Sequence, residues 1–247
     1  MTKRPLSKIA VFGLMLGLGA LLAAILAGVG TRADLWSYRM GLGILRYAAW
    51  TGLGGATVAL IGCFAASAPA RRGLALAATG AIAGLLAYAV PASGLNKARS
   101  VPRIHDITTD TATPPAFIAA LEARKKSNAQ NSAVYAGEAI ATQQRKGYPD
   151  IKPLTVKEEP ARLFDRALAL ARKSGWDILA SDKDSGRIEA TDTTLWFGFK
   201  DDIVIRIQAD GSGGSRLDIR SVSRVGRSDA GTNAARIRHY IAAMGSP

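Results

Sequence analysis

The stretch that decides the fold is IAVFGLMLGLGALLAAILAGVG, residues 9–30, which runs for 22 residues without a charged side chain. A helix needs about 20 residues to cross the hydrocarbon core of a bilayer. Inside that core, only helical backbone satisfies its own polar groups within one segment. Two further uncharged runs follow, at 47–70 and 73–96. The sequence therefore predicts three transmembrane helices within a membrane anchor at 1–95, at about 9–30, 47–69 and 73–95.

The first run has a rival interpretation as a cleaved signal peptide, because Lys3, Arg4 and Lys8 precede it. Its apolar part is longer than the roughly 7–15 residues of such signals, and two more apolar runs follow. We therefore expect an uncleaved anchor. No charged residue lies within a span core, which argues against an ion or substrate pathway through the helices.

The orientation is predicted from the basic residues beside the spans. The first helix usually dominates, and three cations precede it, which favours a cytoplasmic N-terminus. An odd number of spans then places the C-terminal part on the opposite side. We predict a bacterial inner-membrane protein with its C-terminal domain in the periplasm.

The net charge of +13 is spread along the chain. Residues 96–247 hold 24 Lys and Arg against 18 Asp and Glu, and the two signs alternate. A nucleic-acid-binding protein concentrates basic residues on one face or tail, so nucleic acid is not an expected partner. The expected partner is the lipid bilayer, because of the three apolar runs. The single cysteine, Cys63, lies in an apolar run and cannot form an intrachain disulfide.

Residues 96–149 are predicted as a linker and irregular segment, with one short helix near 115–126. Prolines and threonines at 97–116 give no helical period. From 150 to 247 we predict an α+β domain with the order β-α-β-β-β-β-α, an antiparallel sheet covered by two helices on one face. The expected strands are 151–156, 176–181, 187–199, 203–208 and 216–225. Between the third and fourth, Lys200 and Asp201 would form a hairpin tip.

Alternation along the last strands assigns two faces. The apolar side chains Ile203, Ile205, Ile207, Leu217 and Ile219 should point toward the helices. The opposite face then carries a charged set that we predict to be solvated. It consists of Arg206, Gln208, Arg216, Asp218, Arg220 and Arg224.

Two long runs carry a family resemblance. TDTTLWFGFKDDIVIRI (191–207), followed by GSRLDIRSVSRVGRSDAGTNAARIR (214–238), resembles the bacterial and plastid family catalogued as domain of unknown function 1499. IHDITTD (104–110) and YPDIKPL (148–154) are similar to that family's upstream signatures. The resemblance covers about 104–243 and implies a membrane-anchored or exported domain. It implies no reaction, cofactor or catalytic residue.

One candidate ligand site is a possible anion site before the last helix. Two arginines precede a turn of small residues, and the first N–H groups of a helix attract phosphate or carboxylate. The residues of this site are Arg224, Arg227, Ser228, Gly231, Thr232 and Asn233. The alternative is that Ser228 or Asp229 caps the helix and that the arginines pair with acids.

A second candidate is a polar pocket at one end of the sheet. Ser221 and Ser223 continue the inward face of the last strand, and Asp192 and Thr194 continue that of an earlier one. Inward polar groups need partners or water. The cluster is therefore either a pocket or a set of buried hydrogen bonds that fixes the fold.

No nucleophile-elbow, metal-binding or cysteine motif is present, so we predict no metal and no cofactor. The leading hypothesis is a non-enzymatic binding or accessory domain at the membrane. Its ligand would be an anionic small molecule, a lipid headgroup or an envelope protein partner. One alternative is a hydrolase-like enzyme that uses the inward polar cluster. Another is a scaffold subunit of a membrane complex.

Overall fold

The computed structural model describes residues 5–67 and 72–245, in two compact units. The helical unit contains the chain up to Asn96 together with Leu195–Gly198. The α+β unit contains Lys97–Thr194 and the chain from Phe199 onward. Three long apolar helices followed by an antiparallel sheet with helices confirm the predicted fold class.

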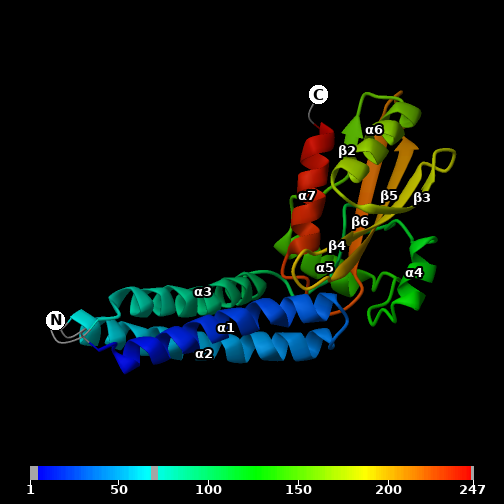
Figure 1. Cartoon of the computed structure of the whole chain (residues 1–247). Coiled ribbons are helices and arrows are strands. Elements are labelled where there is room, and N and C mark those ends of the chain that lie inside the picture. Colours follow the sequence, from blue (N-terminus) through cyan, green and yellow to red (C-terminus); the bar gives the residue numbers. More distant parts are fainter. Residues whose placement is uncertain (1–4, 68–71, 246–247) are drawn as a thin grey trace. The chain divides into compact units, whose positions relative to one another are not determined.

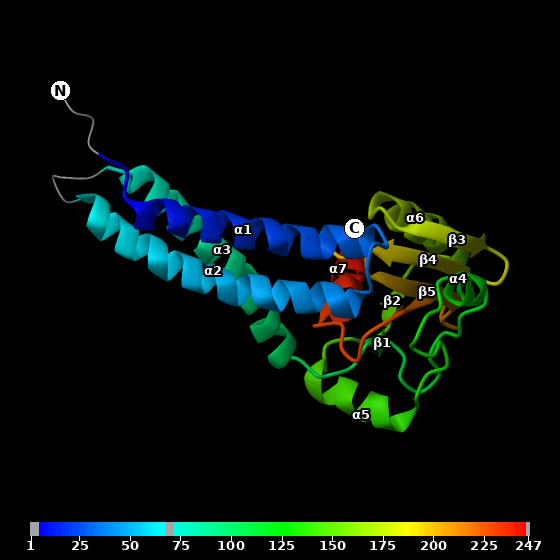
Figure 2. The ribbon, with the colours of Figure 1, turned by 60° about the horizontal axis from the view of Figure 1, so that its bottom comes forward.

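The helical unit consists of α1 (Lys8–Arg32), α2 (Tyr38–Ser67) and α3 (Leu74–Arg99), each long and apolar enough to cross a membrane. The three helices run side by side in alternating directions (Figure 2). α2 begins before the uncharged run at 47, because a helix can continue beyond the hydrocarbon core while its arginines extend toward water. The predicted end of the second span near residue 69 lies outside the described residues.

Glycines allow these helices to approach closely. A Cβ on Gly17 would lie 2.2 Å from the carbonyl oxygen of Gly80, and one on Gly84 would lie 2.4 Å from that of Gly52. The outward surface of the helices carries many exposed large apolar side chains, among them Phe12, Met15, Leu22, Phe64, Ile82 and Val90. Small residues inside and large apolar residues outside suit a bundle surrounded by lipid.

The α+β unit contains six strands and four helices among the described residues (Figure 1). They are β1 (Asp106–Thr108), α4 (Ala120–Lys126), α5 (Glu138–Gly147), β2 (Leu154–Val156), α6 (Pro160–Lys173), β3 (Asp177–Asp182), β4 (Arg187–Thr193), β5 (Lys200–Ala209), β6 (Ser215–Ser223) and α7 (Thr232–Gly245). From β2 onward the order is the predicted β-α-β-β-β-β-α. Pro160 occupies the first turn of α6, and Gly175, at φ 78°, follows its end.

Two local predictions are wrong. The interval 96–149 is not a linker and irregular segment throughout, because it contains β1 and α5 as well as the expected short helix α4. The strand predicted at 187–199 ends at Thr193, and the hairpin turns at 194–199 instead of at Lys200 and Asp201. The amide of Thr194 donates to the carbonyl of Phe199 at 2.8 Å, which closes this turn.

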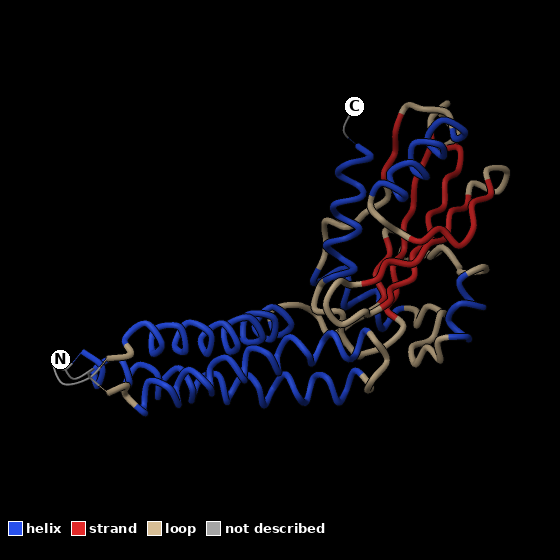
Figure 3. The backbone as a smooth tube through the Cα atoms, viewed as in Figure 1, coloured by secondary structure: helices blue, strands red, loops and turns tan. Residues whose placement is uncertain are grey.

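The sheet is antiparallel, with strand order β1-β6-β5-β4-β3. Its strands are red in Figure 3. β2 also pairs with β6, at the opposite end of that strand from β1. Residues Asp106–Thr108 pair with 220–222, and Leu154–Val156 pair with 215–217. The outer edge of β6 is therefore covered by two short strands from separate parts of the chain.

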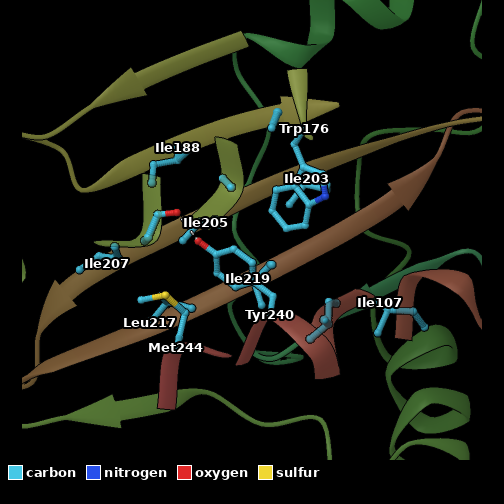
Figure 4. Packing of buried hydrophobic residues seen from close by; sticks show 14 of the residues in the cluster. Ile107, Trp176, Ile188, Ile203, Ile205, Ile207, Leu217, Ile219, Tyr240 and Met244 are labelled. Carbon is cyan, nitrogen blue, oxygen red and sulfur yellow. Dashed lines mark hydrogen bonds between the residues drawn. The ribbon is translucent and has the colours of Figure 1, made fainter. Parts of the chain in front are cut away.

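α6 and α7 cover one face of the sheet, as predicted (Figure 1). The inward strand residues pack against Leu163, Phe164, Ile237 and Met244 in one buried cluster. Figure 4 shows Met244 and Tyr240 among these strand residues. Tyr240 stacks on Trp176 with ring centroids 5.0 Å apart, and its hydroxyl donates to the carbonyl of Ala167 at 2.6 Å. The assignment of the isoleucines and Leu217 to this face is confirmed.

The opposite face is also covered, and its predicted solvation is wrong for three of its six residues. Asp218, Arg220 and Arg224 are buried, whereas Gln208 is exposed. We call residues 109–136, which include α4 and pack over this face, the cover segment. Phe117 and Ala120 of this segment form a second apolar cluster with Val204 and Val222. The charges tolerate burial because each one has an opposite partner, as described next.

Candidate functional site

Arg220 is at the centre of the covered face. Its Nε and Nη2 donate to the two carboxylate oxygens of Asp106 at 2.8 and 2.7 Å. Its Nη1 donates to the carbonyl of Pro115 at 3.1 Å, and its Nη2 also donates to that of Ala133 at 2.9 Å. The rings of Phe117 and Tyr135 lie 5.0 and 5.3 Å from the guanidinium carbon. This arginine therefore joins β6, β1 and the cover segment, and its donors are used within the protein.

Asp202 is the second centre of this face and is fully buried. It accepts from Nη1 of Arg124 at 2.7 Å and from Nη2 of Arg224 at 2.7 Å. The hydroxyl of Thr191 donates to it at 2.8 Å. Arg224, a residue of the predicted anion site, also donates to the hydroxyl of Ser127 at 3.1 Å. Its guanidinium is thus committed to internal partners.

Asp218 and Asp110 form the third centre, between two arginines. Arg206 donates to both carboxylates, at 2.9 and 3.0 Å, and Arg216 donates to both at 3.1 and 2.8 Å. Burial acts to raise the pKa of Asp110, but hydrogen bonds from Thr113 and from the amide of residue 112, with the charge of Arg216, lower it below its usual value.

Glu189 fixes the start of the helix in the cover segment. Its two carboxylate oxygens accept from the backbone amides of Ile118 and Ala120 at 2.8 and 2.9 Å. Negative charge is favourable at this end of a helix. Together the three centres and Glu189 form the outer ion-pair lattice, which holds the cover segment on the sheet.

A second polar group, the inner polar cluster, lies on the helix-covered face. Arg236 of α7 donates to Asp192 at 2.7 Å and to Asp201 at 2.7 Å, and its Nη1 donates to the hydroxyl of Ser221 at 3.0 Å. The hydroxyl of Ser221 in turn donates to Oδ1 of Asn233 at 2.7 Å. Asn233 also donates to the hydroxyl of Ser223 at 3.0 Å.

The structure therefore brings three of the four predicted pocket residues together, namely Asp192, Ser221 and Ser223. Thr194 lies in the hairpin turn, where its hydroxyl accepts from the amide of Phe199 at 2.9 Å. Asn233, assigned by sequence to the anion site, belongs to the inner polar cluster instead. The hydroxyl of Ser221 donates to an amide oxygen, which is not a general base, so this geometry does not activate a nucleophile.

The start of α7 carries its own carboxylate. Asp229 accepts from the amides of Gly231 and Asn233, both at 2.8 Å. Desolvation raises the pKa of this carboxyl, although the two amide bonds act to lower it. Ser228 accepts from the amide of Ala230 at 3.2 Å, and Thr232 is the first residue of α7. Amides that a bound anion would use are thus occupied, and Arg227 is exposed beside them.

The remaining candidate is a surface. Within the described part of the α+β unit, the exposed large hydrophobic side chains are Ile118, Leu121 and Val134, at 62, 48 and 78% exposure. All three lie in the cover segment. Leu121 and Ala133, the neighbour of Val134, line one hollow of about 400 Å³, together with Arg124, Lys125, Asn128, Ala129 and Asn131. We call the three apolar side chains and this hollow the cover surface.

A second hollow, of about 330 Å³, lies beside α5 and is lined in part by Thr109, Gln144 and Tyr148. Gln144 forms two hydrogen bonds with the backbone of Thr108, at 3.0 and 2.6 Å, and Thr109 donates to Asp218 at 3.3 Å. The amide of Gln144 and the hydroxyl of Thr109 therefore support the fold. Across the residues that the structure describes, no group of three or more His, Cys, Asp or Glu side chains is placed to hold a metal ion.

One family model covers both polar groups. A family model described as "Protein of unknown function (DUF1499)" matches residues 106–244, more than half of the chain. The chain belongs to the DUF1499 family. The DUF1499 region begins with β1 and ends within α7, so it includes the outer ion-pair lattice and the inner polar cluster. The predicted resemblance is confirmed. A search of curated proteins found no match.

Several residues of the two polar groups were not predicted from the sequence. Asp106, Asp110 and Arg124 come from the supposed linker, and Arg236 was assigned no role. Of these residues, only Asp201 could have been placed from the sequence. It shares strand parity with Ile203 and therefore points inward. The other partners meet only after the cover segment folds onto the sheet.

Proposed function

We propose that this DUF1499 protein is an integral membrane protein of the bacterial inner membrane whose α+β unit binds a protein partner through the cover surface. The observation that carries this proposal is that the exposed Ile118, Leu121 and Val134 all lie in the cover segment, where Leu121 lines the hollow. A cluster of exposed apolar side chains rimmed by polar residues is typical of a protein-binding site. The outer ion-pair lattice and the inner polar cluster bind to groups within the protein, so the cover surface is the best-supported site.

The cover surface is also rigid, which favours binding. Arg124, which lines the hollow, is held by Asp202 and by the carbonyl of Asn131, both at 2.7 Å. Glu189 fixes the preceding backbone at Ile118 and Ala120. A surface ordered before binding loses less conformational entropy when a partner docks.

Charge indicates the chemistry of the partner. Lys125 and Lys126 are exposed on α4, and Lys125 lines the hollow. An apolar side chain would enter the hollow, and an acidic residue next to it would face the two lysines. We therefore propose a partner segment that combines an apolar residue with flanking Asp or Glu, presented by another protein of the cell envelope.

The other hypotheses have less support. A ligand site at Arg224 requires a guanidinium that already binds Asp202, and Asp229 already occupies the start of α7. A hydrolase at the inner polar cluster requires Ser221, which is fully buried and donates to Asn233. The scaffold hypothesis merges with the binding hypothesis if the partner belongs to a stable membrane complex.

Site-specific photo-cross-linking in intact cells tests the proposal. A photoreactive residue at Leu121 or at Val134 should give one adduct of the same additional mass. The same residue at Lys173, an exposed position on α6, should give none. Lys125→Glu combined with Lys126→Glu should reduce the adduct at least several-fold without lowering the amount of folded protein. Equal labelling at 121 and 173, or no adduct at 121 and 134, would contradict the proposal.

A further inference from the structure

The turn of the β4–β5 hairpin contains a segment that packs with the membrane helices. Leu195–Gly198 belongs to the helical unit. The indole Nε1 of Trp196 donates to the carbonyl of Ile25 at 3.2 Å, and Arg32 donates to the carbonyl of Leu195 at 2.9 Å. We call residues 195–198 the hairpin tip.

A glycine on α1 makes room for the ring of Trp196. A Cβ on Gly28 would lie 2.1 Å from Cδ1 and 2.2 Å from Nε1 of this indole. Two residues further on, a Cβ on Gly30 would lie 2.1 Å from the ring of Trp36, whose own Nε1 donates to the carbonyl of Ala27 at 3.2 Å. Trp196 and Trp36 thus each pack against a glycine near the C-terminal end of α1. We call these two packing positions the tryptophan seats.

The position of these seats along α1 indicates their environment. Ile25 and Gly28 lie inside the uncharged run that ends at Gly30. At 1.5 Å per helical residue they are roughly 3–8 Å from the end of that run. Tryptophan is enriched at this depth because its ring is apolar and its N–H finds a polar partner near the headgroups. On α2, the exposed Trp50 and Tyr47 add further aromatic rings.

Leu195 supports the same environment. Its side chain is 88% exposed, although it lies next to a tryptophan seated on an apolar helix. Phe197, by contrast, is buried and packs edge-on against Trp196, with centroids 5.1 Å apart. An exposed leucine flanked by a seated tryptophan matches the composition of a segment that enters a bilayer interface.

We infer that the hairpin tip is a membrane-interface anchor. Trp196 lies at the headgroup level beside α1, and Leu195 inserts into the lipid next to it. The partner of this surface is the bilayer itself. The protein is then attached to lipid at a segment of the β4–β5 hairpin in addition to its three helices.

The test uses an environment-sensitive fluorophore in the full chain, reconstituted into lipid nanodiscs. Cys63→Ala removes the natural cysteine, and Leu195→Cys carries the label. The expected result is at least a threefold loss of fluorescence with lipids that bear a nitroxide near the headgroup, and little quenching by aqueous iodide. Labels at Asp184→Cys and Ser212→Cys, in two other exposed hairpin turns, should show the reverse.

Two outcomes would overturn the inference. Iodide quenching at 195 equal to that at 184 would place the tip in water. Protection from both quenchers would place it against protein instead of lipid.

A matched pair of glycine variants tests the tryptophan seat. Gly28→Val should displace Trp196 and reduce the nitroxide quenching at 195 at least twofold. Gly30→Val should displace Trp36 and leave that quenching unchanged. If the nitroxide quenching at residue 195 is the same in both variants as in the parent protein, the seat on Gly28 does not hold the hairpin tip. That part of the inference then fails.

Discussion

Arg220 and Asp106 are 114 residues apart in sequence and form a bidentate pair with almost no exposure to water. Each charge is stable there only because the other is present, since an unpaired buried charge loses its hydration without compensation. Such a pair contributes less to net stability than to specificity. It favours one register of β1 on β6 over the alternatives.

Removing one member of this pair should be costly. Arg220→Met leaves Asp106 buried without its partner, and we expect the free energy of unfolding to fall by about 3–5 kcal/mol. Arg220→Lys should recover only part of the loss, because an ammonium cannot bind both carboxylate oxygens in a fork. Denaturant unfolding of the full chain in detergent, followed by near-ultraviolet circular dichroism, measures both effects.

The pair between Arg238 and Asp150 provides the control, because both side chains are about half exposed. Arg238→Met should change the same free energy by less than about 1 kcal/mol. Equal losses at 220 and 238 would show that burial does not govern the contribution of these ion pairs.

Asp110 predicts a dependence on pH. Its pKa is lowered in the folded protein, so its ionised form stabilises the fold above the unfolded value of 3.8. That contribution disappears as the pH falls through the lower, folded pKa. Asp110→Asn should therefore destabilise the protein by about 1.5–3 kcal/mol at pH 7. The difference should shrink below about pH 4, as measured by denaturant unfolding at several pH values. A difference that stays constant from pH 7 to pH 3 would contradict this assignment.

At this scale the sequence predicted types of residue better than their partners. Strand parity brought Asp192, Ser221 and Ser223 to one face correctly. It could not predict the role of Arg236, because this side chain comes from a helix. Which face of that helix meets the sheet depends on packing. The charged face was predicted as solvated, since alternation shows which side chains share a face but not what covers that face.

At the scale of elements, the clearest periodicities gave the right elements. α6, α7 and β3–β6 follow from apolar spacing, from Pro160 and Gly175, and from the DGSGGS turn. β1 and β2 have three residues each, too few for a pattern. α5 is a mostly polar helix with only two buried residues, Ala141 and Gln144, so its apolar signal is weak.

Close helix approach in the anchor gives a prediction with internal controls. Gly17→Leu and Gly80→Leu place side chains against the backbone of the facing helix. We expect each to destabilise the bundle by about 1–3 kcal/mol through overpacking. Gly19→Leu and Gly94→Leu should be neutral, because nothing lies within 4 Å of a Cβ at either position. The midpoint of thermal aggregation in detergent would order the four variants, and a lower midpoint for Gly19→Leu would count against the described packing.

At the scale of the whole molecule, the three helices predict on which side of the membrane the α+β unit lies. If the N-terminus is cytoplasmic, a reporter fused after Pro247 should be active in the periplasm, and one fused after residue 72 should be silent there. The reverse pattern would place the α+β unit in the cytoplasm. The partner of the cover surface would then be a cytosolic protein, and the cross-linking experiment would still identify it.

The pairing of β6 with both β1 and β2 also determines when this domain becomes complete. β1 leaves the ribosome more than one hundred residues before Arg220, its partner on the sheet. Contacts at such long range form slowly, because the intervening chain must be ordered first. Until β6 is synthesised, the early segment has no strand to join and remains open to proteases and chaperones. Synthesis of this one strand closes a sheet edge and supplies the partners of buried charges, so residues 215–223 determine when the middle of the chain can fold.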